Sequence, residues 1–215
     1  AGDYTQKPIE QWIIEGLKSG DVVGYDPFLH TVRDIQTLTR KCGVKDISFK
    51  PIAGNLIDLI WTDQPQKPRG LVCDFPDEIA GLGREQKGGY VMDAMRAHEA
   101  YACVISAPDS IAWLLNIRGA DVACTPYVLS YLIVCIDGTL NWIVDPCKVA
   151  GLGELAGVKL YDINVLGDVV RELADFSNGR PVLIDEGKLP FAILDMIERR
   201  SEEHTSELQS RETIS

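Results

Sequence analysis

The sequence predicts an α/β fold in which helices flank a mixed sheet. Short apolar runs typical of buried strands alternate with segments whose apolar residues recur at helical spacing. Asp137-Gly138 separates two apolar runs and indicates a tight hairpin, because glycine tolerates the positive φ that a two-residue turn needs. The order helix, strand ending on aspartate, loop and helix also occurs twice, with Asp26 and Asp185 in equivalent places. This repetition predicts a duplicated α/β domain.

The first copy is predicted over residues 1–69. It begins with an amphipathic helix that ends at Gly20 and has its apolar positions at Ile9, Trp12, Ile13 and Leu17. A short buried strand is predicted over 22–26. A second amphipathic helix follows, with apolar positions at Val32, Ile35 and Leu38. The second copy has a long stretch before its equivalent helix and the first has almost none. We therefore expect 1–69 to be the C-terminal half of a truncated domain.

The second copy is predicted to be complete over residues 70–200. Its elements should be a helix at 85–98, strands at 100–106, 127–136, 140–144 and 158–161, a helix carrying Leu166, Val169, Val170 and Leu173, a strand at 181–185, and a helix carrying Phe191, Leu194 and Ile197. The hairpin gives an antiparallel pair, and helical connections favour parallel pairs. The sheet is therefore expected to be mixed.

Composition and charge exclude several function classes. The chain has 46% hydrophobic and 25% charged residues, which is typical of a soluble globular protein. Its net charge of −11 argues against a nucleic-acid-binding surface, since such a surface needs a basic stripe. No apolar run approaches the roughly 20 residues of a membrane span. We therefore expect a cytoplasmic protein that binds neither nucleic acid nor membrane.

Metal-ligating and nucleophilic residues form no recognised motif. No C-x-x-C pair occurs, which favours free thiols over disulfides or a metal site for Cys42, Cys73, Cys103, Cys124, Cys135 and Cys147. His98-Glu99 begins like H-E-x-x-H, but Ala102 stands where the second ligand belongs. His30 lies at a helix entry, where a solvated or capping role is favoured. No G-x-S-x-G nucleophile elbow is found. We therefore predict no catalytic residue, no metal ligand and no cofactor in this chain.

Two other patterns favour structural explanations. Residues 151–156 read G-L-G-E-L-A, but they neither follow a strand directly nor open a long helix, as a dinucleotide fingerprint requires. A connecting loop is predicted there. Trp61 and Trp113 could be ligand platforms, but each lies in an apolar run, which favours core packing.

The strongest candidate site lies within residues 109–134. An apolar run over 111–115 stops at a short polar loop over 116–121, which carries Arg118 and Asp121, and a second apolar run follows. Loops held by rigid elements often bind ligands. The alternative is an Arg–Asp pair that merely ties the loop down, and spacing alone favours this alternative.

Two motifs carry a family resemblance. They are I-A-W-L-L-N-I-R-G over 111–119, which continues to Leu129-Ser130-Tyr131, and N-L-I-D-L-I-W-T-D-Q-P over 55–65. In this order they resemble the N-terminal, non-catalytic portion of three-domain Xaa-Pro aminopeptidases (aminopeptidase P) of the creatinase family, over roughly residues 1–200. The resemblance implies the creatinase N-terminal domain, a ribonuclease-H-like α/β fold, as one partial and one complete copy.

The resemblance also implies a function. Enzymes of this kind are metallopeptidases that release the N-terminal residue preceding proline, using two divalent metal ions, commonly manganese, in a C-terminal catalytic domain. None of that domain's motifs occurs here. The chain would then shape substrate access and subunit arrangement in a homodimeric enzyme, and proline-containing peptides would be reached only through the missing domain.

Arg118 and Asp121 are the predicted substrate-binding residues, on a loop that would face the active site of the whole enzyme. Cys124-Thr125 precedes Pro126 where relatives often have Asn or His, which puts polar contacts at this loop in doubt. Two alternatives stay open. One is a stand-alone creatinase-N-like binding or dimerisation module, and the other is a fragment of a related hydrolase such as a prolidase or creatinase.

The C-terminal tail has a different character. Residues 200–210 read R-S-E-E-H-T-S-E-L-Q-S, which lacks apolar periodicity and resembles the translation of a sequencing-adapter oligonucleotide. We therefore expect 201–215 to be a non-native tail, disordered or weakly helical, with the native sequence continuing beyond Arg199. The alternative is a natural polar tail.

Overall fold

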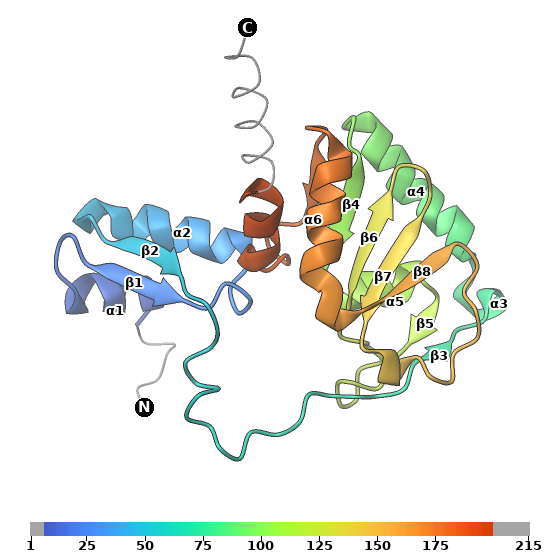
Figure 1. Cartoon of the computed structure of the whole chain (residues 1–215), viewed down its shortest axis with the longest axis horizontal. Coiled ribbons are helices and arrows are strands. Elements are labelled where there is room, and N and C mark those ends of the chain that lie inside the picture. The colour runs from blue at the N-terminus through green and yellow to red at the C-terminus, as the bar shows by residue number, and fades with distance from the viewer. Residues whose placement is uncertain (1–6, 200–215) are drawn as a thin grey trace, which may run out of the picture. The chain divides into compact units, whose positions relative to one another are not determined.

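The computed structural model describes residues 7–199 (Figure 1). These residues form two compact units. Unit 1 contains 7–65 together with 186–192, and unit 2 contains 66–185 together with 193–199. The predictions made for the tail at 201–215 lie outside the described residues.

Unit 1 contains a parallel strand–helix–strand arrangement preceded by a helix. Its elements are α1 (Ile9–Gly16), β1 (Val22–Tyr25), α2 (Val32–Cys42), the short 3-10 helix η1 (Gly43–Lys45) and β2 (Ser48–Pro51). β1 and β2 pair in parallel, with Val22 opposite Ser48 and Tyr25 opposite Pro51. Its core consists of Ile13, Tyr25, Ile35, Leu38, Cys42 and Ile47.

The start of α2 is fixed by a capping box. The hydroxyl of Thr31 accepts a hydrogen bond from the backbone N–H of Asp34 (3.2 Å), and the Asp34 carboxylate accepts one from the N–H of Thr31 (3.1 Å). The predicted apolar stripe of this helix is confirmed, since Val32, Ile35 and Leu38 are all buried. Thr31 is the N-cap, so His30 does not cap this helix. Instead, the His30 ring packs edge-on against Tyr25.

A segment distant in sequence completes unit 1. The backbone N–H of Val32 donates to the carbonyl of Leu189 (3.0 Å), and the N–H of Phe191 donates to the carbonyl of His30 (2.9 Å). The ring of Phe191 packs edge-on against Tyr25, with centroids 5.8 Å apart. Unit 1 is therefore discontinuous in sequence.

Three predictions about burial in the first 65 residues are wrong. Only Ile13 of α1 is buried, whereas Trp12 is 66% exposed. β1 was expected to be a buried strand, yet only Tyr25 is buried, because a two-stranded sheet leaves much of each strand uncovered. Trp61 is 46% exposed rather than packed in a core. Trp61 lies in the stretch 52–72, which contains neither helix nor strand and also exposes Leu56, Ile57, Leu59 and Ile60.

Unit 2 is built on a five-stranded mixed sheet. In spatial order the strands are β8 (Val158–Asp162), β7 (Leu140–Val144), β6 (Tyr131–Cys135), β4 (Ala102–Ile105) and β9 (Val182–Ile184). The pairs β4–β6 and β6–β7 are antiparallel, and the pairs β4–β9 and β7–β8 are parallel. The predicted α/β class with a mixed sheet is confirmed.

Helices cover both faces of this sheet (Figure 1). The longer ones are α4 (Arg84–Ala97), α5 (Pro108–Leu114) and α6 (Leu166–Ser177), and the shorter ones are α3 (Asp77–Ala80) and the 3-10 helices η2 (Pro146–Lys148) and η3 (Ile163–Val165). Residues 191–199 are also helical. On β6, Leu132 and Val134 pack in the same core as Met95 of α4, whereas Ile133 lines a cavity with Val169 of α6. α4 and α6 therefore lie on opposite faces.

The predicted hairpin between β6 and β7 is confirmed. Gly138 has a φ of +89°, and its N–H donates to the carbonyl of Cys135 (2.9 Å). The Asp137 carboxylate accepts a hydrogen bond from the N–H of Thr139 (2.9 Å). β6 begins at Tyr131 rather than at residue 127 as predicted, because the preceding residues bond to the loop after β5 instead of joining the sheet.

None of the helices within residues 7–199 has both the length and the apolar character needed to cross a membrane.

A second small sheet in unit 2 pairs β3 (Cys73–Asp74) with β5 (Ile117–Arg118) in the antiparallel sense. This small sheet and α5 together place the candidate site.

Candidate functional site

The candidate site lies at the corner between α5 and β5. The chain leaves α5 through Asn116, which adopts a left-handed conformation with a φ of +47° that asparagine tolerates better than most residues. The Asn116 side chain is buried. Its amide nitrogen donates to the Asp77 carboxylate (2.7 Å) and to the carbonyl of Leu82 (2.8 Å), and its oxygen accepts from Lys87. These bonds hold the corner in one conformation.

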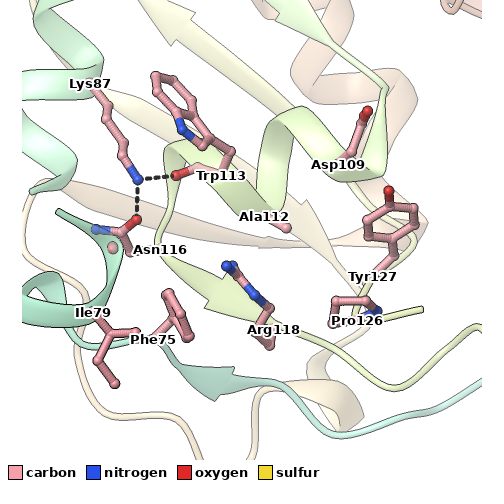
Figure 2. A pocket seen from close by; sticks show the side chains of 11 residues that line it. Phe75, Ile79, Lys87, Asp109, Ala112, Trp113, Asn116, Arg118, Pro126 and Tyr127 are labelled. Carbon is pink, nitrogen blue, oxygen red and sulfur yellow. Dashed lines mark hydrogen bonds between the residues drawn. The ribbon is translucent and has the colours of Figure 1, made fainter. Parts of the chain in front are cut away.

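Lys87 is a buried cation in unit 2. It is 2% exposed, and its ammonium donates to the carbonyl of Trp113 (2.9 Å) and to the oxygen of Asn116 (Figure 2). The ammonium also lies 4.7 Å from the centroid of the Trp113 ring, within the range of a cation–π contact. Burial lowers the pKa of Lys87, and the nearby positive charge of Arg118 lowers this pKa further.

Arg118 lies on the short strand β5, not on a loop as predicted. Its guanidinium stacks over the ring of Phe75, with the central carbon 3.9 Å from the ring centroid, and one terminal nitrogen donates to the carbonyl of Ile117 (2.7 Å). Arg118 lines a pocket of about 420 Å³ (Figure 2). The other lining residues are Phe75, Ile79, Ala80, Lys87, Asp109, Ala112, Trp113, Asn116, Pro126 and Tyr127.

Asp121 lies apart from Arg118, and its carboxylate is fully buried. It forms an ion pair with Lys148 (2.7 Å) and accepts hydrogen bonds from the backbone N–H groups of Leu129 (2.7 Å) and Gly70 (2.9 Å). Asp121 therefore ties three segments of unit 2 together. The alternative prediction of an ion pair between Arg118 and Asp121 is wrong, because the cation that pairs with Asp121 is Lys148.

The loop after β5 also needs a glycine. A β-carbon built on Gly119 would lie 2.6 Å from the carbonyl oxygen of Tyr127 and 2.8 Å from the β-carbon of Val128. This close approach allows Gly119 to donate a backbone hydrogen bond to Pro126 (3.2 Å). The loop and the segment before β6 are thereby held together.

Sequence reasoning missed Lys87 and misplaced Trp113. Lys87, Val91 and Met95 recur every four residues along α4, so Lys87 lies on the apolar stripe of its helix. A lysine on such a stripe was the signal that could have revealed it. Trp113 was expected in the core, but it is 47% exposed at the pocket because it lies on the outer side of α5.

The remaining candidates behave as loops or isolated groups. Residues 151–156 form a connection before β8, as predicted for the G-x-G-x-x-A stretch. All six cysteines are free. Within residues 7–199, no group of three or more His, Cys, Asp or Glu side chains is arranged to hold a metal ion.

Comparisons with known proteins identify the family and related enzymes. The family model described as "Creatinase/Prolidase N-terminal domain" matches residues 63–213. A "Probable Xaa-Pro aminopeptidase P" of Pyrenophora teres f. teres is 32% identical over 167 residues, which cover 75% of this chain and 25% of the relative. The protein of the same description from Coccidioides posadasii (strain RMSCC 757 / Silveira) is 32% identical over 192 residues, which cover 86% of this chain and 30% of the relative.

A solved structure supports the fold. The X-prolyl aminopeptidase of Caenorhabditis elegans, described as a cytosolic enzyme with a di-nuclear active site, matches 89% of this chain and 32% of its own chain with a TM-score of 0.77 and 24% identity. The chain thus spans between a quarter and a third of the length of these relatives. The family match covers most of the chain, including the whole five-stranded sheet of unit 2. The chain therefore belongs to the Creatinase/Prolidase N-terminal domain family.

Proposed function

We propose that this chain is the N-terminal, non-catalytic region of a metal-dependent Xaa-Pro aminopeptidase. The observation that carries the proposal is the similarity of both units to proteins described as Xaa-Pro aminopeptidase P, at 32% identity over up to 86% of the chain. The whole enzyme would release the residue that precedes proline from peptides. Its two metal ions, expected to be manganese, would lie in a catalytic domain outside this chain.

Residues 1–69 are proposed to be the partial first copy of the domain and residues 70–200 the complete second copy. Two sets of elements in the same order support this duplication. The set α1, β1 and α2 in the first part of the chain corresponds to α6, β9 and the helix at 191–199. Asp26 and Asp185 follow the strand in their respective sets. The domain would shape substrate access and subunit arrangement in a cytoplasmic homodimer.

Arg118 and Asp121 have separate roles in this proposal. Asp121 is fully buried and bonded to three segments, so it would hold the loop after β5 in place. Arg118 lines a pocket, so it would be the residue that faces the active site of the whole enzyme. Cys124 is exposed on the same loop and would supply no strong hydrogen bond there.

The first experiment is a chimera. Residues 1–199 would replace the matching region of the Caenorhabditis elegans enzyme, and cleavage of an Xaa-Pro peptide with manganese would be measured. We expect the chimera to cleave the peptide and the isolated chain to leave it intact. A folded chimera without activity, or manganese-dependent cleavage by the isolated chain, would contradict the proposal.

The same chimera tests Arg118. Replacement by methionine should raise the KM for the peptide, because one cation is lost from the pocket. Arg96→Met is the matched control, since Arg96 lies exposed on α4 and its loss changes the net charge equally. If the two variants have the same KM, Arg118 does not face the substrate.

The exposed apolar residues at 56–61 favour one alternative, a stand-alone dimerisation module. Light scattering of the isolated chain tests it: a stable dimer that Leu59→Ser breaks would support the module.

A fragment of a prolidase or creatinase is the other alternative, because the family model covers both classes. Sequencing the locus beyond Arg199 separates these possibilities, since each hydrolase carries its own catalytic domain and a module carries none.

A further inference from the structure

The pocket beside α5 combines two inward-facing cations with apolar and aromatic walls. Figure 2 shows the Arg118 guanidinium and the Lys87 ammonium directed into the same pocket, with Phe75 and Trp113 beside them. Neither cation has a carboxylate ion-pair partner in the described part of the chain. Two cations that face one pocket and form no ion pair favour an anionic ligand.

The hydrogen-bonding capacity of both groups is only partly used. An ammonium has three donors, and that of Lys87 has two acceptors, the carbonyl of Trp113 and the side-chain oxygen of Asn116. The guanidinium has five donors, and that of Arg118 makes one hydrogen bond, to the carbonyl of Ile117. Its stacking on Phe75 occupies the face of the guanidinium and leaves its edge available. Such an edge matches the two oxygens of a carboxylate.

The charges around Lys87 leave one positive charge in excess. The positive charge of Arg84 is balanced by its ion pair with Asp74. The Asp77 carboxylate accepts a hydrogen bond from Asn116, which carries no charge. Among the described residues, Asp77 is a carboxylate near Lys87 that forms no ion pair, and it offsets one of the two positive charges of Lys87 and Arg118. The other carboxylate that lines the pocket, Asp109, is exposed and lies at the far side from Lys87 in Figure 2. Solvent screens its charge.

An apolar cavity adjoins the cationic pocket. It measures about 410 Å³ and is lined by Val91, Ile105, Asp109, Ser110, Trp113 and Leu114. It shares Trp113 and Asp109 with the cationic pocket, so the half-exposed indole lies between the two. A ligand that fills both cavities would need an anionic end and an apolar end.

We propose that these two cavities bind a carboxylate attached to an apolar group, with Arg118 and Lys87 holding the carboxylate and Trp113 contacting the apolar group. The free C-terminus of a short peptide and an acidic side chain next to an apolar residue share this chemistry. The site lies wholly in unit 2 and needs no catalytic domain. It therefore does not rest on the proposed peptidase function.

The test is a titration of the whole chain, labelled with nitrogen-15 and followed by two-dimensional NMR. N-acetyl-L-leucine is the probe, N-acetyl-L-leucinamide is its uncharged counterpart, and the α-amide of N-acetyl-L-leucyl-L-glutamic acid carries the carboxylate on a side chain next to an apolar residue. We expect saturable shifts of the Trp113 indole N–H with the first probe and not with the amide. The indole peak is assigned with Trp113→Phe.

The variants make the test specific. Arg118→Met should weaken binding by about tenfold or more, since a charge-assisted bidentate hydrogen bond is lost. Arg96→Met, with the same change in net charge, should bind like the unaltered chain. Phe75→Leu removes the stacking ring without changing any charge and should also weaken binding, which keeps the test usable if Arg118→Met does not fold.

Each outcome decides the proposal. Equal binding of N-acetyl-L-leucine and its amide, unchanged binding in a folded Arg118→Met variant, or no saturable shift with either carboxylate probe would overturn it. Selective binding of either carboxylate supports it. The tighter probe then identifies the source of the carboxylate as a peptide terminus or an acidic side chain.

Discussion

Replacing Asp121 with asparagine should strongly destabilise unit 2. The Asp121 carboxylate is 0% exposed; one of its oxygens accepts from Lys148 and Leu129, and the other accepts from Gly70. An amide has one oxygen and one NH2 group, so in either orientation its NH2 group would face a donor. Lys148, whose side chain is 6% exposed, would also lose the only anion with which it pairs within the described residues.

The expected loss is about 3–5 kcal/mol of unfolding free energy, the range for removing one partner of a buried ion pair. Asp168→Asn is the matched control because Asp168 also pairs with a cation, Arg171, but its side chain is 74% exposed. Its cost should stay within about 1 kcal/mol. The double variant Asp121→Asn with Lys148→Met should recover part of the loss, because no unpaired charge stays buried.

Urea unfolding followed by Trp142 fluorescence reports on unit 2 alone. Trp142 is 0% exposed, and its indole N–H donates to the hydroxyl of Ser130 (3.0 Å), so unfolding of this unit changes its environment. The other tryptophans are exposed enough to be replaced by phenylalanine at little cost; they are Trp12, Trp61 and Trp113. If Asp121→Asn costs no more than Asp168→Asn, the buried ion pair does not hold the loop and the reasoning fails.

Three further predictions concern backbone and charge. Gly119→Ala should lower stability by about 1–3 kcal/mol through the clash with the carbonyl of Tyr127, and a change below a few tenths in the same urea assay would contradict the close approach. Gly89→Ala, inside α4 with no neighbouring atom near the added carbon, should raise stability by about 0.5–1 kcal/mol; a loss would show hidden crowding. The backbone N–H of Thr139 lowers the pKa of Asp137 in the folded protein. The ionised carboxylate therefore stabilises the fold fully at pH values above its ordinary pKa of 3.8, and this stabilisation is lost as the pH falls through the lowered pKa of the folded state. Asp137→Asn should therefore differ from the unaltered chain at neutral pH and converge with it in acid, and a difference that persists in acid would refute this link.

The sequence predicted those parts of the fold that depend on local periodicity and turn chemistry. The apolar stripe of α6, with Leu166, Val169, Val170 and Leu173, is buried as expected. The turn at Asp137-Gly138 follows directly from the conformational freedom of glycine. Each of these two signals is carried by residues only a few positions apart in the chain, so no knowledge of distant partners was needed.

The candidate site could be placed only in part, because its contacts join residues far apart in sequence. Spacing suggested Arg118 as the partner of Asp121, but the actual cation, Lys148, comes from η2, and no periodic pattern marks it. Trp113 lies in an apolar run, yet the turn of α5 directs it outwards. Periodicity gives the face of a helix, and the neighbouring elements decide whether that face is covered.

The discontinuity of unit 1 bears on how the protein folds during its synthesis. Ribosomes release a chain from its N-terminus, so β1 and α2 emerge long before residues 186–192 exist. Until then the backbone N–H of Val32 and the carbonyl of His30 lack the partners that they have in the folded unit. Unit 1 therefore stays incompletely hydrogen-bonded while the whole five-stranded sheet is translated, and a nascent chain stopped before residue 186 lacks the segment that completes this unit.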